Sequence, residues 1–284
     1  MSTIERRLAE RFPAAFRGRR ARIVRPLLAL AGRMSGLERI RGFLERSGHL
    51  RGLPFVAAAL DFLEAGYELD AAGLARIPAS GGVLVVANHP SGALDALALL
   101  DAVGRVRSDV RIVANDLLEE LDGIAGLLLP VRIVGGRPGA ASIAAIEDAL
   151  RAGQCVIVFP AGEVARLGWR GVRDGRWRAG FLRFARATGV PVLPVRVEAR
   201  NSALFYGASA VFKPIGAALL AREMLARRRR RIVLHVGQPL QLPGDVPTGR
   251  LLRAVREELA AIGTARAGNA FAGATVARHK AIID

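Results

Sequence analysis

His89 and Asp95 are the residues of this chain whose types and spacing suit acid–base chemistry. A neutral imidazole can take a proton from a hydroxyl or an amine near pH 7. A carboxylate on its other nitrogen fixes the tautomer and stabilises the imidazolium that forms. Taken alone, the pair has a plain alternative: His89 is a structural residue at a strand end, and Asp95 complements the dipole in the first turn of a helix.

An apolar run and a turn surround this pair. Residues 82–87 are typical of a buried strand, and the apolar stretch 93–103 is typical of a helix. Between them, Pro90 and Gly92 turn the chain. The pair therefore lies at the carboxyl end of a predicted strand, which is where open α/β sheets carry their ligand sites.

A second predicted strand ends in a similar way. The apolar run 155–158 leads into residues 159–163, which read Phe-Pro-Ala-Gly-Glu. Gly162 lets the backbone bend close to a substrate, and Glu163 can bind an ammonium or hydroxyl group. Pro160 and Gly162 are equally typical of a simple turn. Two strands with polar, turn-rich ends indicate one site assembled from two loops.

Strand and helix patterns alternate along the chain. The predicted strands cover residues 83–87, 110–114, 131–134, 155–159, 190–197 and 231–236, and the predicted helices cover residues 53–69, 93–103, 116–127, 140–151, 179–188 and 248–262. This alternation predicts an α/β fold with a mixed, mostly parallel sheet flanked by helices. We expect three parts: a basic helical region over 1–52, an α/β domain over 53–263 and a loosely attached tail over 264–284.

Composition limits the classes of molecule that this protein is expected to bind. Lys and Arg number 42 against 25 Asp and Glu, and the formal net charge of +17 implies a polyanionic partner such as anionic lipid, nucleic acid or an acidic carrier protein. Aromatic residues make up only 5%, and no nucleic-acid-binding motif is visible, so no nucleic acid is expected. The single cysteine excludes an internal disulfide, and the four histidines lack ligand spacing, so no metal is expected.

Residues 1–52 contain thirteen arginines, and Leu37, Ile40 and Leu44 form a helical apolar stripe among them. Basic amphipathic helices of this kind lie in membrane interfaces. A helix packed on the core with a solvated basic face is the alternative. The apolar runs are shorter than the ~20 residues that span a bilayer, and no signal peptide is visible. We therefore expect a peripheral protein on the anionic, cytoplasmic face of the inner membrane.

The ordered set of segments resembles a known family. Asn88-His89 with Asp95, then residues 159–163, then Val-Pro-Val-Leu-Pro-Val over 190–195 follow the order of the glycerolipid (lysophosphatidic acid acyltransferase-like) acyltransferase family. The chain is similar to the bacterial hemolysin-like branch, which includes lyso-ornithine-lipid acyltransferases. Further features that look like this branch are Trp177, Gly180-Phe181, Phe184-Ala185 and Arg200-Asn201-Ser202. The resemblance covers roughly residues 54–239.

The resemblance implies an O-acyltransferase that moves an acyl group from a thioester of coenzyme A or acyl carrier protein to a lyso-lipid hydroxyl, with no cofactor. It implies His89 as the general base and Asp95 as the residue that orients it. In the family, an arginine after the strand predicted over 131–134 contacts the acceptor's phosphate, and Arg137 matches that place. Backbone N–H groups near Gly92 or Gly162 are candidates to stabilise the oxyanion. The residues expected to contact substrates are Asn88, Ser91, Gly92, Arg137, Phe159, Pro160, Gly162, Glu163 and Arg166.

Departures from the family pattern bear on the acceptor. Five residues separate His89 from Asp95, where the larger family has four, and the usual Phe-Pro-Glu-Gly-Thr-Arg becomes Phe-Pro-Ala-Gly-Glu-Val. The carboxylate of Glu163 opposes a phosphate dianion and suits an amine, so a lyso-ornithine lipid is the predicted acceptor. Arg137, Arg166 and Arg170 can supply a phosphate pocket, which keeps lysophosphatidic acid as the alternative.

Two other classes of function stay open. The hemolysin-like label suggests a lipid hydrolase or lysin, although Ser91 does not sit in a G-x-S-x-G elbow. The charge also suits a non-catalytic basic protein that binds membrane or nucleic acid and in which His89 is inert.

Overall fold

The computed structural model describes residues 37–115, 118, 121–131, 133–134, 137–168, 171–202, 223, 225 and 232–263. These fall into two compact units. The larger unit holds the described residues of 47–165, 174–200 and 229–284, and the smaller holds those of 1–46, 166–173 and 201–228. The predicted tail, and residues 1–36 of the predicted basic region, lie outside the described residues. The predicted three-part division therefore stays a prediction.

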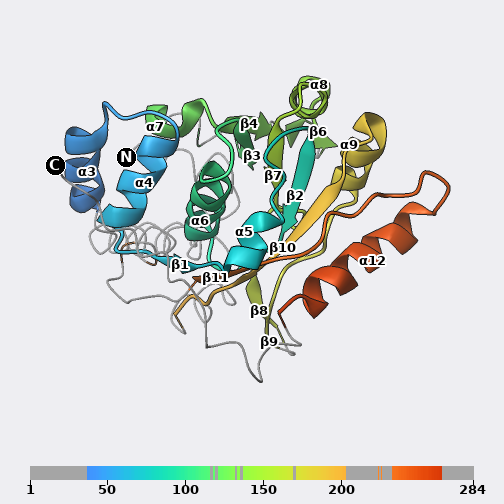
Figure 1. Cartoon of the computed structure of the whole chain (residues 1–284). Coiled ribbons are helices and arrows are strands. Elements are labelled where there is room, and N and C mark those ends of the chain that lie inside the picture. The colour runs from blue at the N-terminus through green and yellow to red at the C-terminus, as the bar shows by residue number, and fades with distance from the viewer. Residues whose placement is uncertain are drawn as a thin grey trace, which may run out of the picture. The chain divides into compact units, whose positions relative to one another are not determined.

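Seven strands form the sheet of the larger unit, in the order β1-β11-β10-β2-β7-β3-β4 (Figure 1). The strands are β1 (Tyr67–Glu68), β2 (Val83–Ala87), β3 (Val110–Asn115), β4 (Leu128–Val131), β7 (Cys155–Val158), β10 (Val192–Glu198) and β11 (Ile232–Val236). All neighbours pair in parallel except β10 and β11, which pair antiparallel. The predicted mixed, mostly parallel sheet is confirmed.

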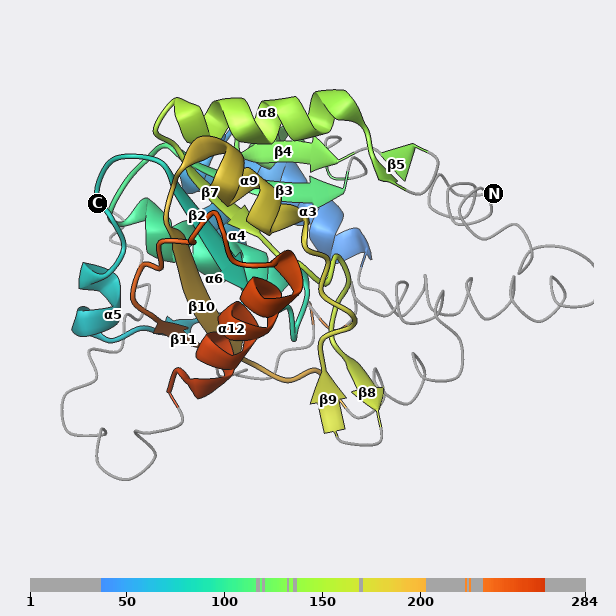
Figure 2. The ribbon, with the colours of Figure 1, turned by 90° about the vertical axis from the view of Figure 1, so that its right-hand side faces the viewer.

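Helices cover both faces of this sheet (Figure 2). One layer contains α4 (Leu53–Phe62), α5 (Ala71–Ala75) and α6 (Ala93–Gly104), and the other contains α8 (Ala140–Arg151), α9 (Gly180–Thr188) and α12 (Thr248–Ala261). Every residue of the central strand β2 is buried, which explains its unbroken apolar run. Leu84 and Val86 belong to the core under α8, α9 and α12, and the alternate residues of the strand point to the opposite face.

The remaining elements are short. They are α3 (Leu37–Ser47), α7 (Asp122–Ala125), the hairpin of β5 (Ile133–Val134) and β6 (Arg137–Pro138), and the hairpin of β8 (Arg166–Gly168) and β9 (Gly171–Arg173). The β8–β9 hairpin belongs to the smaller unit. Among the helices of the described residues, none is long and apolar enough to cross a membrane.

Three sequence predictions are wrong in detail. The helix predicted over 116–127 is only the short α7 in its described part, and β4 begins at Leu128, before the strand predicted over 131–134. The apolar run that starts at Leu128 becomes a strand because it pairs in parallel with β3, with Ile112 opposite Leu128. The periodicity of a short apolar run does not by itself separate a buried helix from a strand. The helix predicted over 53–69 ends at Phe62, because the chain turns through Glu64 at φ 51° and then enters β1.

Arg107 ties together three segments beside the sheet. Its guanidinium donates to the carbonyl oxygens of Pro78, Gly81 and Gly153 at 2.6–3.1 Å and pairs with Asp109 at 2.6 Å. The Arg107 side chain is only 3% exposed. The arginine holds the pKa of the Asp109 carboxyl below 3.8. This pair therefore stabilises the fold at neutral pH, and its contribution is lost as the pH falls through the folded-state pKa of Asp109.

Arg107→Ala is expected to lower the free energy of unfolding by about 2–3 kcal/mol, because it leaves three carbonyls and a carboxylate without their donor. Arg151→Ala is the matched control, since Arg151 is half exposed and pairs only with Glu147 and Asp148 on its own helix. Exposed pairs of that kind contribute about 0.2–1 kcal/mol. Urea unfolding of both variants measures the difference, and equal losses would contradict the assigned role.

Candidate active site

Two loops leave the sheet at the same edge. Strands β2 and β7 pair in parallel, with Val86 opposite Val158, so their carboxyl ends lie side by side. His89 follows β2 and Phe159 follows β7, and their rings stack with centroids 3.9 Å apart and planes 20° apart. The two segments singled out in the sequence therefore meet in the structure.

His89 faces Asp95. Its Nδ1 lies 3.1 Å from Asp95 Oδ2, and the side chains are 17% and 0% exposed respectively. The distance suits a hydrogen bond, but the ring N–H is not aligned with the oxygen. Catalytic hydrogen bonds are often loose before a substrate binds and tighten in the complex. Because Nδ1 is buried against Asp95, Nε2 is the nitrogen that remains for a substrate.

Asp95 is also the third residue of helix α6, and its side chain caps the start of that helix. Its Oδ2 accepts the backbone N–H groups of Ser91 at 2.7 Å and Gly92 at 2.9 Å, and its Oδ1 accepts the Ser91 hydroxyl. Gly92 adopts φ 87°, which favours glycine at this position. The two interpretations of Asp95 thus coexist, because the capping bonds hold the carboxylate in the rotamer that faces His89.

Asn88 clamps this loop to the neighbouring strand. Its side-chain amide donates to the Val197 carbonyl at 2.8 Å and accepts the Val197 N–H at 2.7 Å. The amide thereby extends the pairing of β2 with β10 beyond the end of β2, as a peptide group would. The structure gives Asn88 a place in positioning His89, and its predicted contact with substrate stays a prediction.

Backbone bonds fix the loop that follows β7. Phe159 accepts the Gly162 N–H at 2.9 Å, the buried Pro160 accepts the Arg178 N–H at 3.0 Å, and His89 accepts the Ala165 N–H at 2.8 Å. The N–H groups of Gly92 and Gly162 themselves are occupied in this structure, and the prediction of oxyanion donors near these two residues stays a prediction. The Gly92 N–H is bonded to Asp95, and the Gly162 N–H is bonded to Phe159.

Glu163 is half-buried against the segment that follows β9. A Cβ built on Gly175 would lie 2.7 Å from Glu163 Oε1, so the Glu163 carboxylate lies close to the main chain of Gly175. Glu163 therefore lies beside Gly175, which follows Asp174 in the chain. Asp174 itself contacts His89.

Arg137 and Arg166, the two arginines predicted to bind substrate, lie on other elements. Arg137 begins β6, and its side chain is outside the described part of the chain. Arg166 begins β8 in the smaller unit. Their predicted roles stay predictions.

Sequence reasoning missed Asp174. Its Oδ1 accepts the backbone N–H of His89 at 3.1 Å, and its Oδ2 accepts the Trp177 indole N–H at 3.0 Å. Burial raises the pKa of the Asp174 carboxyl, and the bonds from His89 and Trp177 oppose that rise. Trp177 stood out in the sequence, but Asp174, three residues before it, follows no apolar strand that would have marked it.

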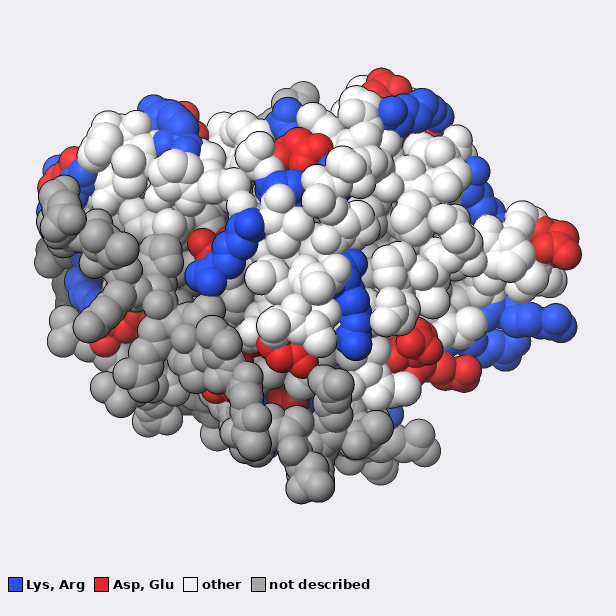
Figure 3. Space-filling model, in the orientation of Figure 1, with Lys and Arg blue, Asp and Glu red and all other residues white. Residues whose placement is uncertain are grey.

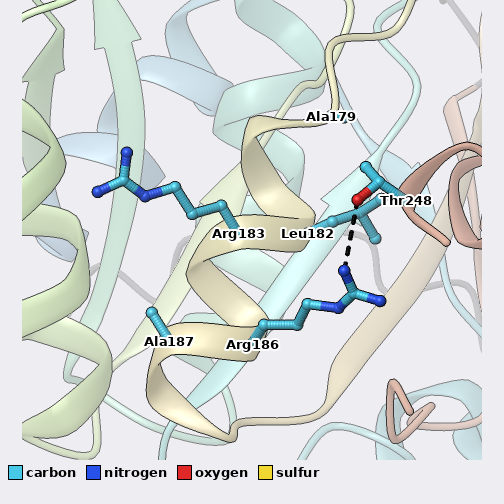
Figure 4. Close-up of a pocket in the computed structure, with 6 residues that line it drawn as sticks. All are labelled: Ala179, Leu182, Arg183, Arg186, Ala187 and Thr248. Carbon is cyan, nitrogen blue, oxygen red and sulfur yellow. Dashed lines mark hydrogen bonds between the residues drawn. The ribbon is translucent and has the colours of Figure 1, made fainter. Parts of the chain in front are cut away.

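A separate pocket of about 430 Å³ lies between α9 and α12 (Figure 4). It is lined by Ala179, Leu182, Arg183, Arg186, Ala187 and Thr248. Arg186 reaches across it to Thr248 at 3.3 Å and donates to the carbonyls of Pro243 and Val246. These bonds tie the start of α12 to α9, and the pocket contains neither His89 nor Asp95. Among the described residues, no group of three His, Cys, Asp or Glu is placed to hold a metal ion.

Comparisons with known proteins identify the family of this chain. The family model described as Acyltransferase matches residues 21–259. The chain belongs to the acyltransferase family. A lyso-glycine lipid O-acyltransferase of Phocaeicola vulgatus is 32% identical over 205 residues, which cover 70% of this chain and 72% of that protein. One of Bacteroides thetaiotaomicron is 30% identical over 210 residues, which cover 72% of this chain and 76% of that protein.

Among solved structures, the 1-acyl-sn-glycerophosphate (LPA) acyltransferase PlsC from Thermotoga maritima aligns with a TM-score of 0.48 and 20% identity, covering 82% of this chain and 93% of that chain. The protein is an acyltransferase, and the matched region contains His89, Asp95 and the loop after β7.

Proposed function

We propose that this acyltransferase moves a fatty acyl group from a thioester to the hydroxyl of a lyso-lipid, with His89 as general base. The observation that carries the proposal is the 3.1 Å approach of His89 Nδ1 to the buried Asp95 carboxylate, at the carboxyl ends of two adjacent parallel strands. The two relatives named as lyso-glycine lipid O-acyltransferases support a lyso-lipid acceptor.

In the proposed reaction, His89 Nε2 takes the proton of the acceptor hydroxyl as the oxygen attacks the thioester carbonyl carbon. The charged imidazolium is stabilised by Asp95. When the tetrahedral intermediate collapses, the C–S bond breaks, and the imidazolium returns the proton to the leaving thiolate. An ester and a thiol are formed, and the enzyme returns to its starting state.

Direct transfer fits the surroundings of His89. Ser91, the hydroxyl nearest in sequence, is buried, and it donates to the carboxylate of Asp95. This bond holds it away from the role of an acyl-accepting nucleophile. The acyl group therefore passes from thioester to acceptor without an acyl-enzyme, and the donor is a thioester of acyl carrier protein or of coenzyme A.

The proposed acceptor is a lyso-lipid with an amino-acid head, and specifically a lyso-ornithine lipid. The names of the two relatives support the amino-acid class. Glu163 supports the ornithine head group in particular. Its carboxylate lies beside Gly175, next to Asp174, and suits an ammonium group better than a phosphate dianion. Lysophosphatidic acid is the acceptor that the test must exclude.

The proposed location is the cytoplasmic face of the membrane, with peripheral attachment through the basic region 1–52. On the face drawn in Figure 3, the basic side chains of the described residues stand apart, with acidic and uncharged ones among them. The described residues of that face form no continuous basic surface, and thirteen arginines in residues 1–52 make this region the better candidate for anionic lipid.

The decisive assay incubates purified protein with acyl carrier protein or coenzyme A thioesters and one of four acceptors: lyso-ornithine lipid, lyso-glycine lipid, lysophosphatidic acid or water. Thiol release and the acylated product are both measured. Transfer to a lyso-lipid supports the proposal. Thiol release with water alone identifies a hydrolase, and no reaction with any acceptor identifies a binding protein.

Glu163→Gln is expected to lower kcat/KM for the lyso-ornithine lipid about fivefold, because one charge-assisted bond worth about 1 kcal/mol is lost. The value for lysophosphatidic acid should stay the same or rise. Glu257→Gln on the exposed face of α12 is the matched control and should change neither value. A clear advantage for lysophosphatidic acid that is insensitive to Glu163→Gln would reassign the acceptor.

A further inference from the structure

Asp174 contacts the main chain of His89, whereas Asp95 faces its ring. One oxygen of Asp174 accepts the backbone N–H of His89 at 3.1 Å. The carbonyl of His89 accepts the Ala165 N–H at 2.8 Å. The main chain of His89 is therefore held on both sides, by a carboxylate on one and by the loop after β7 on the other.

Trp177 anchors Asp174 to the core. Its indole N–H donates to the second oxygen of Asp174 at 3.0 Å, and its ring is only 4% exposed. Phe181 meets that ring edge-on, with the centroids 6.1 Å apart, and the Arg256 guanidinium lies 5.7 Å from the ring centroid. A carboxylate bound to such a buried donor is restrained, so it can hold the His89 main chain in place.

Charge also couples Asp174 to the site. The groups that surround it are the His89 imidazole and the Asp95 carboxylate, with Glu163 against the adjacent Gly175 and Arg256 over the Trp177 ring. The His89 imidazole lowers the pKa of Asp174, and the Asp95 carboxylate raises it. The Asp174 carboxylate therefore lies close enough for its charge to act on the imidazolium that forms when His89 takes a proton.

We propose that Asp174 is a second positioning residue of the reaction. It fixes the main chain of His89 through one oxygen, and its charge stabilises the imidazolium that forms when His89 takes the acceptor's proton. The proposal rests on the role of His89 as general base. It assigns the two carboxylates different tasks: Asp95 orients the ring, and Asp174 holds the backbone and adds charge.

The test compares Asp174→Asn, which removes the charge and keeps one acceptor oxygen for the two N–H donors of His89 and Trp177, with Asp174→Ala, which removes the charge and both acceptors. The first readout is the titration of His89 by NMR in protein labelled with ¹³C-histidine, with the signal assigned by its loss in His89→Ala. In Asp174→Asn the midpoint should move to lower pH, since a nearby negative charge is gone. The acidic limb of the pH profile of kcat/KM should move in the same direction.

The second readout is kcat at the pH optimum. We expect a loss of about tenfold in Asp174→Asn and of about 30–100-fold in Asp174→Ala, where the His89 main chain is released as well. Trp177→Phe removes the indole donor and leaves the Asp174 carboxylate. In this variant the titration midpoint of His89 should stay at the wild-type value. Asp148→Asn is the matched control, because this carboxylate is 73% exposed and pairs only with Arg151 on α8.

An unchanged His89 midpoint in Asp174→Asn would overturn the electrostatic part, and wild-type kcat in Asp174→Ala would overturn the positioning part. If Asp174→Ala does not fold, Asp174→Asn decides, because a purely structural role would lower its melting temperature without moving the titration. Wild-type protein that transfers no acyl group would refute the proposed function instead. The NMR midpoint would still test the link between Asp174 and His89.

Discussion

His89→Ala is expected to lower kcat for acyl transfer by about 10²–10⁴-fold, the usual loss when a general base is removed. The acceptor hydroxyl then has to attack without a proton acceptor, and KM should change little, because the imidazole acts mainly in the transition state. Thiol release from the acyl thioester in the presence of saturating lyso-lipid measures the effect.

Stability has to be measured beside this rate. The His89 ring stacks on Phe159, so its removal is expected to lower the free energy of unfolding by about 1 kcal/mol. His235→Ala is the matched control, since His235 lies on β11 and its ring pairs with Glu198 at 3.4 Å. It should keep wild-type kcat. A folded His89→Ala variant with wild-type kcat would end the proposed mechanism.

The central part of the fold could be predicted because its strands are buried on both faces. Strands β2 and β7 are apolar at every position and end at turn residues, so both appeared within one residue of their bounds. The short elements could not be predicted in this way. The two residues of β1 become a strand only because they pair with β11, more than 160 positions along the chain, and the β8–β9 hairpin has no run of apolar residues to mark it.

The candidate site likewise has one part that local sequence predicts and one part that depends on contacts between distant residues. His89 and Asp95 are six positions apart on one turn, so local spacing was enough to pair them. The bonds of Asn88 with Val197 and of Asp174 with His89 join residues 109 and 85 positions apart. They depend on the register of β10 against β2 and on the path of the chain after β9, and neither is encoded in local pattern. Local sequence likewise does not show that the N–H groups of Gly92 and Gly162 are hydrogen-bonded within the protein.

Asp95→Asn has a specific outcome in this geometry, because the loop decides which way the new amide turns. The backbone N–H groups of Ser91 and Gly92 both point at Oδ2, the oxygen that also faces His89. An amide nitrogen there would meet two donors, so the amide oxygen should keep this place. The amide N–H₂ then faces the Ser91 hydroxyl, which can rotate and accept. The capping of α6 and the tautomer of His89 are therefore retained, and only the negative charge is lost.

The expected result of Asp95→Asn is a fall in kcat of about 10²–10³-fold, caused by an imidazolium that lacks its counter-charge. The free energy of unfolding should fall by only about 1 kcal/mol, since the helix cap remains. Ser91→Ala is the matched control: it removes the hydroxyl partner of Asp95 but keeps the charge, and its kcat should stay within about threefold of wild type, the effect of one hydrogen bond. Equal losses in the two variants would show that Asp95 acts through the shape of the loop, whereas a large loss confined to Asp95→Asn assigns its effect to charge.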